Sequence, residues 1–229
     1  MLTPRRGGRA ARGGQAARGG GQDRPAGPRV RSYRGKRQLD LAVLCLAVLP
    51  AAVLGLLAAV AVWLDDGQPV LFRQVRAGRD GRPFVMLKLR TMRRNSGRRD
   101  AFPDHDSCTR VGRWLRRLSI DELPQLINVA RGEMSIVGPR PTLPYQVRRY
   151  DRRQRRRLNA LPGLTGLAQV HGRNRLNWAD RIEWDLRYIE NQSVQLDLAV
   201  LACTAWAVLT GAGSNGHPRG DPIARQMER

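Results

Sequence analysis

The chain has 229 residues with 41 basic and 19 acidic side chains, so its formal net charge at pH 7 is +22. This length favours one domain with tails. The charge excludes an acidic solvating chain and points to anionic partners such as nucleic acid, anionic lipid or a phosphorylated substrate. Three widely separated cysteines predict no disulfide framework, and the three histidines share no zinc-ligand spacing with them.

The N-terminal segment, residues 1–38, contains eleven basic residues and one acidic residue, without apolar periodicity. Such a segment cannot bury enough apolar surface to fold, so we expect a disordered tail. Its charge suits adhesion to anionic membrane lipids, at roughly 1 kcal/mol for each basic residue close to the surface. RNA binding through the Arg-Gly segments and a merely solvated extension are the alternatives.

A membrane helix is predicted over residues 39–66, because residues 41–64 contain no charged side chain. With a rise of about 1.5 Å per residue, such a run can cross a hydrocarbon core of about 30 Å. The basic residues before it place the N-terminus on the cytoplasmic side, and Pro50 predicts a kink. The pattern favours equally a kinked spanning helix and a re-entrant helix that returns to the same face.

Residues 67–212 predict a small α+β domain, mostly helical, with one short β-hairpin. The two β-prone runs at 70–76 and 84–90 are joined by a turn containing Asp80-Gly81, and a loop follows over 93–107.

From residue 110 the apolar positions recur with helical spacing, and arginines flank this stripe. The pattern predicts an interfacial helix, with an ordinary core-facing helix as the alternative. Further helices are predicted over 148–157 and 180–190, and residues 194–210 predict a second interfacial anchor or a buried helix. Residues 213–229 predict a flexible tail.

The adjacent carboxylates Asp121 and Glu122 are the first candidates for chemistry. Ser119, three residues before Glu122, completes a capping-box pattern, so stabilisation of a helix start is the simpler interpretation. Pro124 fits the first helical turn better if Asp121 is the cap. Neighbours on a helix face different directions, so one carboxylate can attack phosphorus while the other holds Mg²⁺.

Two further segments predict contacts with a ligand. Arg140 stands between two prolines, and a stiff loop that presents one arginine suits phosphate recognition, although a structural turn would have the same pattern. Gly163, Gly166 and Gly172 would let the backbone approach a ligand closely.

Together these segments resemble the bacterial sugar transferases, the monotopic polyprenyl-phosphate phosphoglycosyl transferases. They occur in that family's order and spacing and extend over roughly three quarters of the chain. With only the basic tail before the membrane helix, the chain resembles the minimal catalytic form. The matching segments are residues 68–72, 88–92, 109–110, 121–126, 134–141 and 162–174.

The resemblance implies transfer of a sugar-1-phosphate from a UDP-sugar to polyprenyl (undecaprenyl) phosphate, with release of UMP. This is the first membrane step in making exopolysaccharide, O-antigen, capsule or glycoprotein glycans. The expected location is the cytoplasmic face of the bacterial membrane, with downstream glycosyltransferases as partners. A membrane-tethered nucleic-acid binder is the alternative, but it leaves the motifs unexplained, and an aromatic content of 5% argues against a base-stacking platform.

The resemblance also implies the roles of individual residues. Asp121 matches the nucleophile that forms a phospho-aspartate, and Glu122 matches the residue that holds Mg²⁺. The family's membrane element is a re-entrant helix broken at Ser-Pro, where this chain has Leu49-Pro50. The basic residues that match positions around the phosphates are Lys88, Arg90, Arg110, Arg140 and Arg173.

Overall fold

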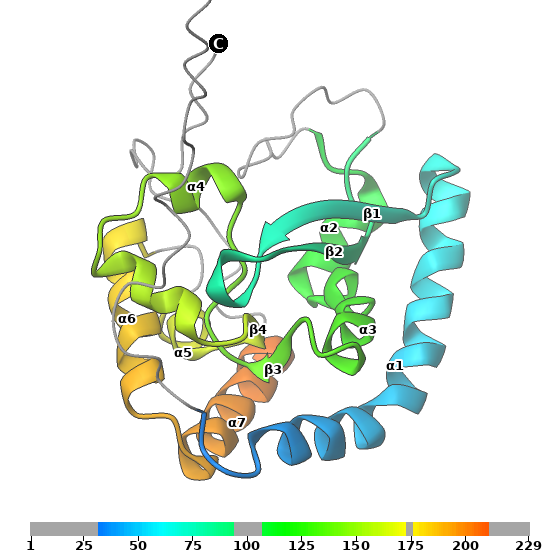
Figure 1. Cartoon of the computed structure of the whole chain (residues 1–229). Helices are drawn as coiled ribbons and strands as arrows, with labels where there is room; N and C mark the ends of the chain where they lie inside the picture. Colours follow the sequence, from blue (N-terminus) through cyan, green and yellow to red (C-terminus); the bar gives the residue numbers. More distant parts are fainter. Residues whose placement is uncertain (1–31, 94–106, 173–175, 211–229) are drawn as a thin grey trace, which may run out of the picture.

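The computed structural model describes residues 32–93, 107–172 and 176–210 (Figure 1). Most of the basic tail, nearly all of the 93–107 loop, Arg173 and the C-terminal tail lie outside these ranges. The fold is α+β, as expected, with two small sheets among helices. In chain order the elements are α1 (Lys36–Asp66), β1 (Leu71–Ala77), η1 (Arg79–Gly81), β2 (Pro83–Leu89), α2 (Arg110–Arg117), η3 (Ile120–Glu122), α3 (Gln125–Ala130), β3 (Ser135–Val137), α4 (Pro144–Arg148), η4 (Gln154–Asn159), β4 (Gly163–Thr165), α5 (Leu167–His171), α6 (Trp178–Glu190) and α7 (Val194–Thr210), where η marks a 3₁₀ helix.

Helix α1 matches the predicted membrane segment, and within the described residues it alone has the length and apolar composition to cross a bilayer. Figure 1 shows that it changes direction and wraps around the domain. Pro50 lies inside it, and its missing N–H removes a helix hydrogen bond, which favours a bend. Most of its large apolar side chains are exposed, so the domain covers little of this helix.

Both ends of α1 are held by the same domain. Near its start, Arg37 donates hydrogen bonds to the carbonyl oxygens of Val129 and Ala130 at the end of α3. At its other end, Asp66 forms an ion pair with Arg90 at 3.1 Å, after β2. A helix that spanned the membrane would separate its two ends by the bilayer, so this arrangement favours the re-entrant form.

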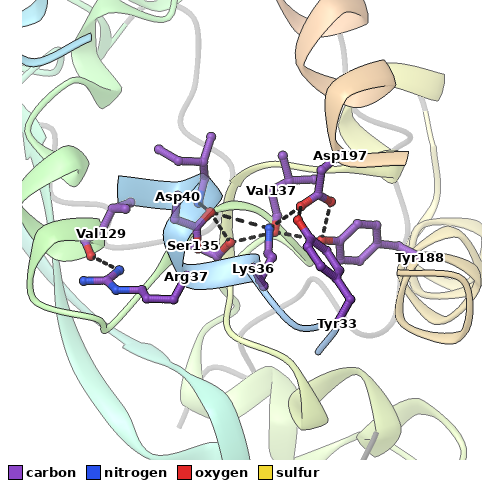
Figure 2. Close-up of polar contacts among 10 residues, drawn as sticks. Tyr33, Lys36, Arg37, Asp40, Val129, Ser135, Val137, Tyr188 and Asp197 are labelled. Carbon is purple, nitrogen blue, oxygen red and sulfur yellow. Dashed lines mark hydrogen bonds and ion pairs between the residues drawn. The ribbon is translucent and has the colours of Figure 1, made fainter. Parts of the chain in front are cut away.

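A buried polar network fixes the start of α1 (Figure 2). Lys36 Nζ lies 2.6 Å from Asp197 Oδ2 in α7, and Tyr33 and Tyr188 donate hydrogen bonds to the same carboxylate. Asp40 Oδ1 accepts hydrogen bonds from Ser135 Oγ at 2.9 Å and from the backbone N–H of Ile136 at 3.0 Å. Charged groups this deeply buried are stable only when paired, so the network specifies where α1 begins.

The predicted hairpin is confirmed, with β1 and β2 antiparallel. Arg76 is opposite Phe84, and Phe72 is opposite Lys88. Directly opposed side chains share a face and alternate residues change face. Arg76 and Lys88 therefore project from one face of the hairpin, while Arg73 projects from the other.

Helix α2 is confirmed, and one of its faces packs into the core as the core-facing alternative expects. Thr109 caps it by accepting a hydrogen bond from Gly112 N at 2.9 Å. Leu115 is buried against α1, whereas Trp114 is 63% exposed. One helix thus contributes to the core and presents an aromatic side chain outward.

The expected helix cap at Ser119 or Asp121 is wrong. Ser119 has φ +58°, and its side chain makes no capping bond, because the chain reverses there at the end of α2. An N-cap residue needs extended backbone, which this turn excludes. The carboxylate pair instead occupies the 3₁₀ helix η3, and α3 begins after Pro124.

A parallel two-stranded sheet, β3 with β4, supports the loop that carries Arg140. Gly163 and Gly166 lie against the backbone of Gly138, with which a side chain on either would collide, so protein packing explains both glycines. Gly172 packs closely on Leu176 in the same way.

Among the remaining helices, the one predicted over residues 148–157 is wrong. Residues 148–157 do not form one helix, because α4 ends at Arg148 and η4 begins at Gln154. The interruption turns Arg157 inward, where it is 2% exposed. Helix α6 is confirmed, and α7 has a buried Asp197 on one face with Trp206 exposed on another.

Candidate active site

Asp121 lies in η3, between α2 and α3, and is 5% exposed. The preceding Ile120 packs against a cluster formed by Val62 of α1, Leu89 of β2 and Leu115 of α2. A left-handed turn at Ser119 follows the end of α2 and leads into the 3₁₀ turn that carries Asp121. The carboxylate therefore lies close to the second half of the apolar helix.

Glu122 forms ion pairs with two cations from different parts of the chain. Its Oε1 lies 2.7 Å from Lys88 Nζ on β2 and 2.6 Å from an Arg140 nitrogen in the loop after β3. Burial alone would raise the pKa of Glu122, but Arg140 and Lys88 together hold it well below its usual range. Glu122 is therefore ionised at neutral pH.

Asp121 has the opposite electrostatic environment. Burial raises the pKa of this carboxyl, and the charge of Glu122 beside it adds to the effect, while Lys88, Arg116 and Arg140 oppose it. Among the residues that the structure describes, Asp121 has no ion pair of its own, whereas Glu122 has two. A carboxylate in that position is less stabilised, and is freer to react, than one held by two cations. Glu122 thus holds the two cations, and the carboxylate of Asp121 is left available to a ligand.

The loop that carries Arg140 is fixed from behind. Gly138 N donates to Thr165 O at 2.8 Å, and Gly163 N donates to Pro139 O at 2.8 Å. Arg157 donates to the carbonyl oxygen of Arg140 at 3.0 Å. A loop held this way presents the Arg140 side chain from a fixed backbone, so less freedom is lost on binding than from a mobile loop.

Arg157 is itself held by buried partners. It forms an ion pair with Asp185 of α6 and donates to the hydroxyl of Tyr150. It therefore connects α6 to the Arg140 loop through one side chain. The sequence offers no signal for this role, because Arg157 stands in a strongly basic run that predicts exposure.

The predicted phosphate-binding residues do not all meet at the carboxylates. Lys88 and Arg140 do. Arg90 instead donates to the carbonyl oxygens of Asp66 and Gly67 and so secures the end of α1. Arg110 is exposed at the first residue of α2, and Arg173 lies outside the described residues.

Two basic residues near the site were not predicted. Arg116, on α2, opposes the rise in the pKa of Asp121. Its Nη1 is 3.4 Å from Cys108 Sγ. Arg76 contacts the Arg140 loop by donating to Pro141 O at 3.3 Å. The alternation of β1 places Arg76 on one face of the strand, but only the tertiary packing shows that this face meets the site.

The residues fit a magnesium ion that shares its ligands with a phosphorylated substrate. Among the residues that the structure describes, no group of three or more His, Cys, Asp or Glu side chains is placed to hold a metal alone. Glu122 is ionised, and within the described ranges its Oε2 has only a 3.5 Å contact with Arg140. Mg²⁺ commonly takes one or two carboxylates and completes its shell with phosphate oxygens and water.

Comparison with known proteins gives a consistent answer. The family described as bacterial sugar transferase matches residues 31–211. A UDP-glucose:undecaprenyl-phosphate glucose-1-phosphate transferase of Caulobacter vibrioides is 45% identical over 200 residues, which cover 82% of this chain and 75% of that protein. The uncharacterised sugar transferase EpsL of Bacillus subtilis is 42% identical over 179 residues, covering 78% of this chain and 89% of EpsL. An undecaprenyl-phosphate glucose phosphotransferase of Komagataeibacter xylinus is 42% identical over 188 residues, or 74% of this chain and 35% of that protein.

Proposed function

The chain belongs to the bacterial sugar transferase family, and we propose that it transfers a sugar-1-phosphate from a UDP-sugar to undecaprenyl phosphate and releases UMP. The product is the first lipid-linked sugar for an exopolysaccharide or capsule. The observation that carries the proposal is the buried Asp121 beside a Glu122 that holds Lys88 and Arg140. A diphosphate substrate needs such cations, and its reaction needs a nucleophile next to them.

The reaction proceeds through Asp121 in two steps. A carboxylate oxygen attacks the phosphorus that carries the sugar, and the bond from that phosphorus to the bridging oxygen breaks, so UMP leaves with the bridging oxygen. An oxygen of undecaprenyl phosphate then attacks the same phosphorus, and the carboxylate of Asp121 leaves. Lys88 and Arg140 stabilise the negative charge that develops on the phosphate oxygens.

Glu122 has two roles in this scheme. It holds the two cations in place before the substrate arrives, and its less occupied Oε2 is the ligand that the chain offers to Mg²⁺. A bound Mg²⁺ would neutralise charge on the diphosphate oxygens.

The membrane arrangement follows from α1. Both of its ends are held by the domain, so the helix enters and leaves the bilayer on the cytoplasmic side. Its second half packs beside Ile120, which supports a position for Asp121 near the depth at which a lipid phosphate lies. The domain over residues 67–212 then works at the membrane surface, where the basic tail adds attraction to anionic lipids and where later glycosyltransferases find the product.

The proposal is tested by Asp121→Asn in the full-length protein. The wild type should release about one UMP per enzyme from the correct UDP-sugar without lipid acceptor, because the covalent step precedes the acceptor. Asp121→Asn should release none. Asp180→Asn, an exposed change at the start of α6, is the matched control and should behave as the wild type. Normal UMP release by Asp121→Asn would refute the assignment. A panel of UDP-sugars in the same assay identifies the sugar.

A further inference from the structure

Arg76 is a basic residue of the site that the reaction as described does not use. It projects from the same face of the hairpin as Lys88, the residue that contacts Glu122. Phe72 is opposite Lys88, and Arg76 lies four residues farther along β1. At about 3.3 Å per residue, this separates the two positions by about 13 Å. One face of the hairpin therefore carries a cation beside the carboxylates and a second cation farther along.

The guanidinium of Arg76 is held in place by neutral acceptors. Gln74 Oε1 accepts from its Nε at 3.0 Å and from its Nη2 at 2.5 Å. Pro141 O accepts from its Nη1 at 3.3 Å, which brings the group beside Arg140. No ion pair within the described ranges includes Arg76, whereas Arg140 has Glu122.

The charges around this point are unbalanced. Lys88 and Arg140 already share the single carboxylate of Glu122, and Arg76 adds another cation. Burial, and then the nearby charge of Arg140, lower the pKa of Arg76 to about 10. The side chain stays protonated at neutral pH, so this part of the site holds a partly buried positive charge that an anion would balance.

We propose, on the basis of the function above, that Arg76 binds the phosphate that leaves with the nucleotide. The order of the groups supports this choice over the phosphate that is attacked. Arg140 contacts Glu122, the neighbour of Asp121, at 2.6 Å, whereas Arg76 reaches the Arg140 loop through Pro141 O at 3.3 Å. Arg76 is thus one contact farther than Arg140 from the carboxylate pair, as the second phosphate of a nucleoside diphosphate is one group farther from the nucleophile than the phosphorus that is attacked.

The test compares UMP binding by Arg76→Gln and Arg73→Gln in the full-length detergent-solubilised protein. Arg73 is exposed on the opposite face of the same strand, so Arg73→Gln should keep wild-type affinity. Arg76→Gln should bind UMP about 10- to 100-fold more weakly, as expected for loss of a charge-assisted hydrogen bond. Its KM for the UDP-sugar should rise similarly, while its KM for undecaprenyl phosphate should stay unchanged.

Arg76→Lys provides a second variant if Arg76→Gln fails to fold, because it keeps the charge and should bind UMP with intermediate affinity. Wild-type UMP affinity in Arg76→Gln, or in Arg76→Lys where only that variant folds, would overturn the assignment. A raised KM for the lipid with unchanged UMP binding would overturn it as well. Failure of the proposed function has a different signature, since the wild type would then release no UMP from any UDP-sugar.

Discussion

Lys36, in the first turn of α1, and Asp197, in α7, form a buried ion pair at 2.6 Å although 161 residues separate them in the chain. The pair joins the start of the apolar helix to the last described helix of the domain. Asp66 and Arg90 join its other end. The course of α1 around the domain is therefore fixed at both ends by ion pairs, and its apolar middle is left exposed.

Replacing Lys36 by Met should lower the free energy of unfolding by about 3–5 kcal/mol, because it leaves Asp197 charged and buried without its cation. The double variant Lys36→Met with Asp197→Asn should recover part of the loss, since neither charge remains. Denaturant unfolding of the detergent-solubilised protein measures both. Arg34→Gln, an exposed change just before α1, is the control. Equal stability of Lys36→Met and the wild type would show that the network does not hold the helix.

The two ends of α1 should be accessible from the same side of the membrane. A cysteine-free variant, with Cys45, Cys108 and Cys203 replaced by Ala, can carry either Arg34→Cys or Gln68→Cys at an exposed position. A membrane-impermeant thiol reagent should label both positions in inverted vesicles and neither in right-side-out vesicles. Labelling from opposite sides would establish a spanning helix.

Glu122→Gln should reduce kcat by about 100- to 1000-fold, the size of effect seen when one preorganised electrostatic contact is lost. The amide keeps the shape of the side chain but leaves Lys88 and Arg140 without their shared charge. Steady-state UMP release measures the effect. Glu183→Gln, which removes an exposed ion pair with Arg153, is the matched control and should stay near wild type. A Glu122→Gln variant that retained wild-type kcat would exclude the proposed role.

Arg157→Lys should weaken the support of the Arg140 loop. A lysine keeps the charge beside Asp185 but lacks the fork that reaches Tyr150 and the Arg140 carbonyl as well. We expect a loss of about 1.5–3 kcal/mol in stability, as for a hydrogen bond from a charged donor, together with a higher KM for the UDP-sugar. Arg156→Lys, in a surface pair with Glu190, should change neither quantity. Unchanged KM in Arg157→Lys would limit the residue to a structural role.

The features that the sequence predicts well are those set by local pattern. The Asp80-Gly81 turn predicts the hairpin, and the spacing of Val111, Trp114 and Leu115 predicts α2, because period and turn chemistry act within a few residues. The apolar run predicts α1 for the same reason. Its course could not be predicted, since ion pairs with residues such as Asp197 decide it.

The site was predicted less completely. Asp121 and Glu122 stand together in the chain, so their proximity needed no tertiary information. The left-handed turn at Ser119 was missed because a serine three residues before a glutamate also has the pattern of a helix cap. Arg76 and Arg157 were missed because burial of an arginine depends on partners distant in sequence, and the default expectation for this residue is exposure.

The most direct measurement is mass spectrometry of the intact protein, quenched during reaction with its UDP-sugar in the absence of lipid acceptor. The wild type should gain the mass of one phosphosugar, located on Asp121 by peptide mapping, absent from Asp121→Asn and removed when undecaprenyl phosphate is added. A wild-type protein that releases UMP while carrying no adduct at Asp121 would contradict the role of Asp121 as nucleophile.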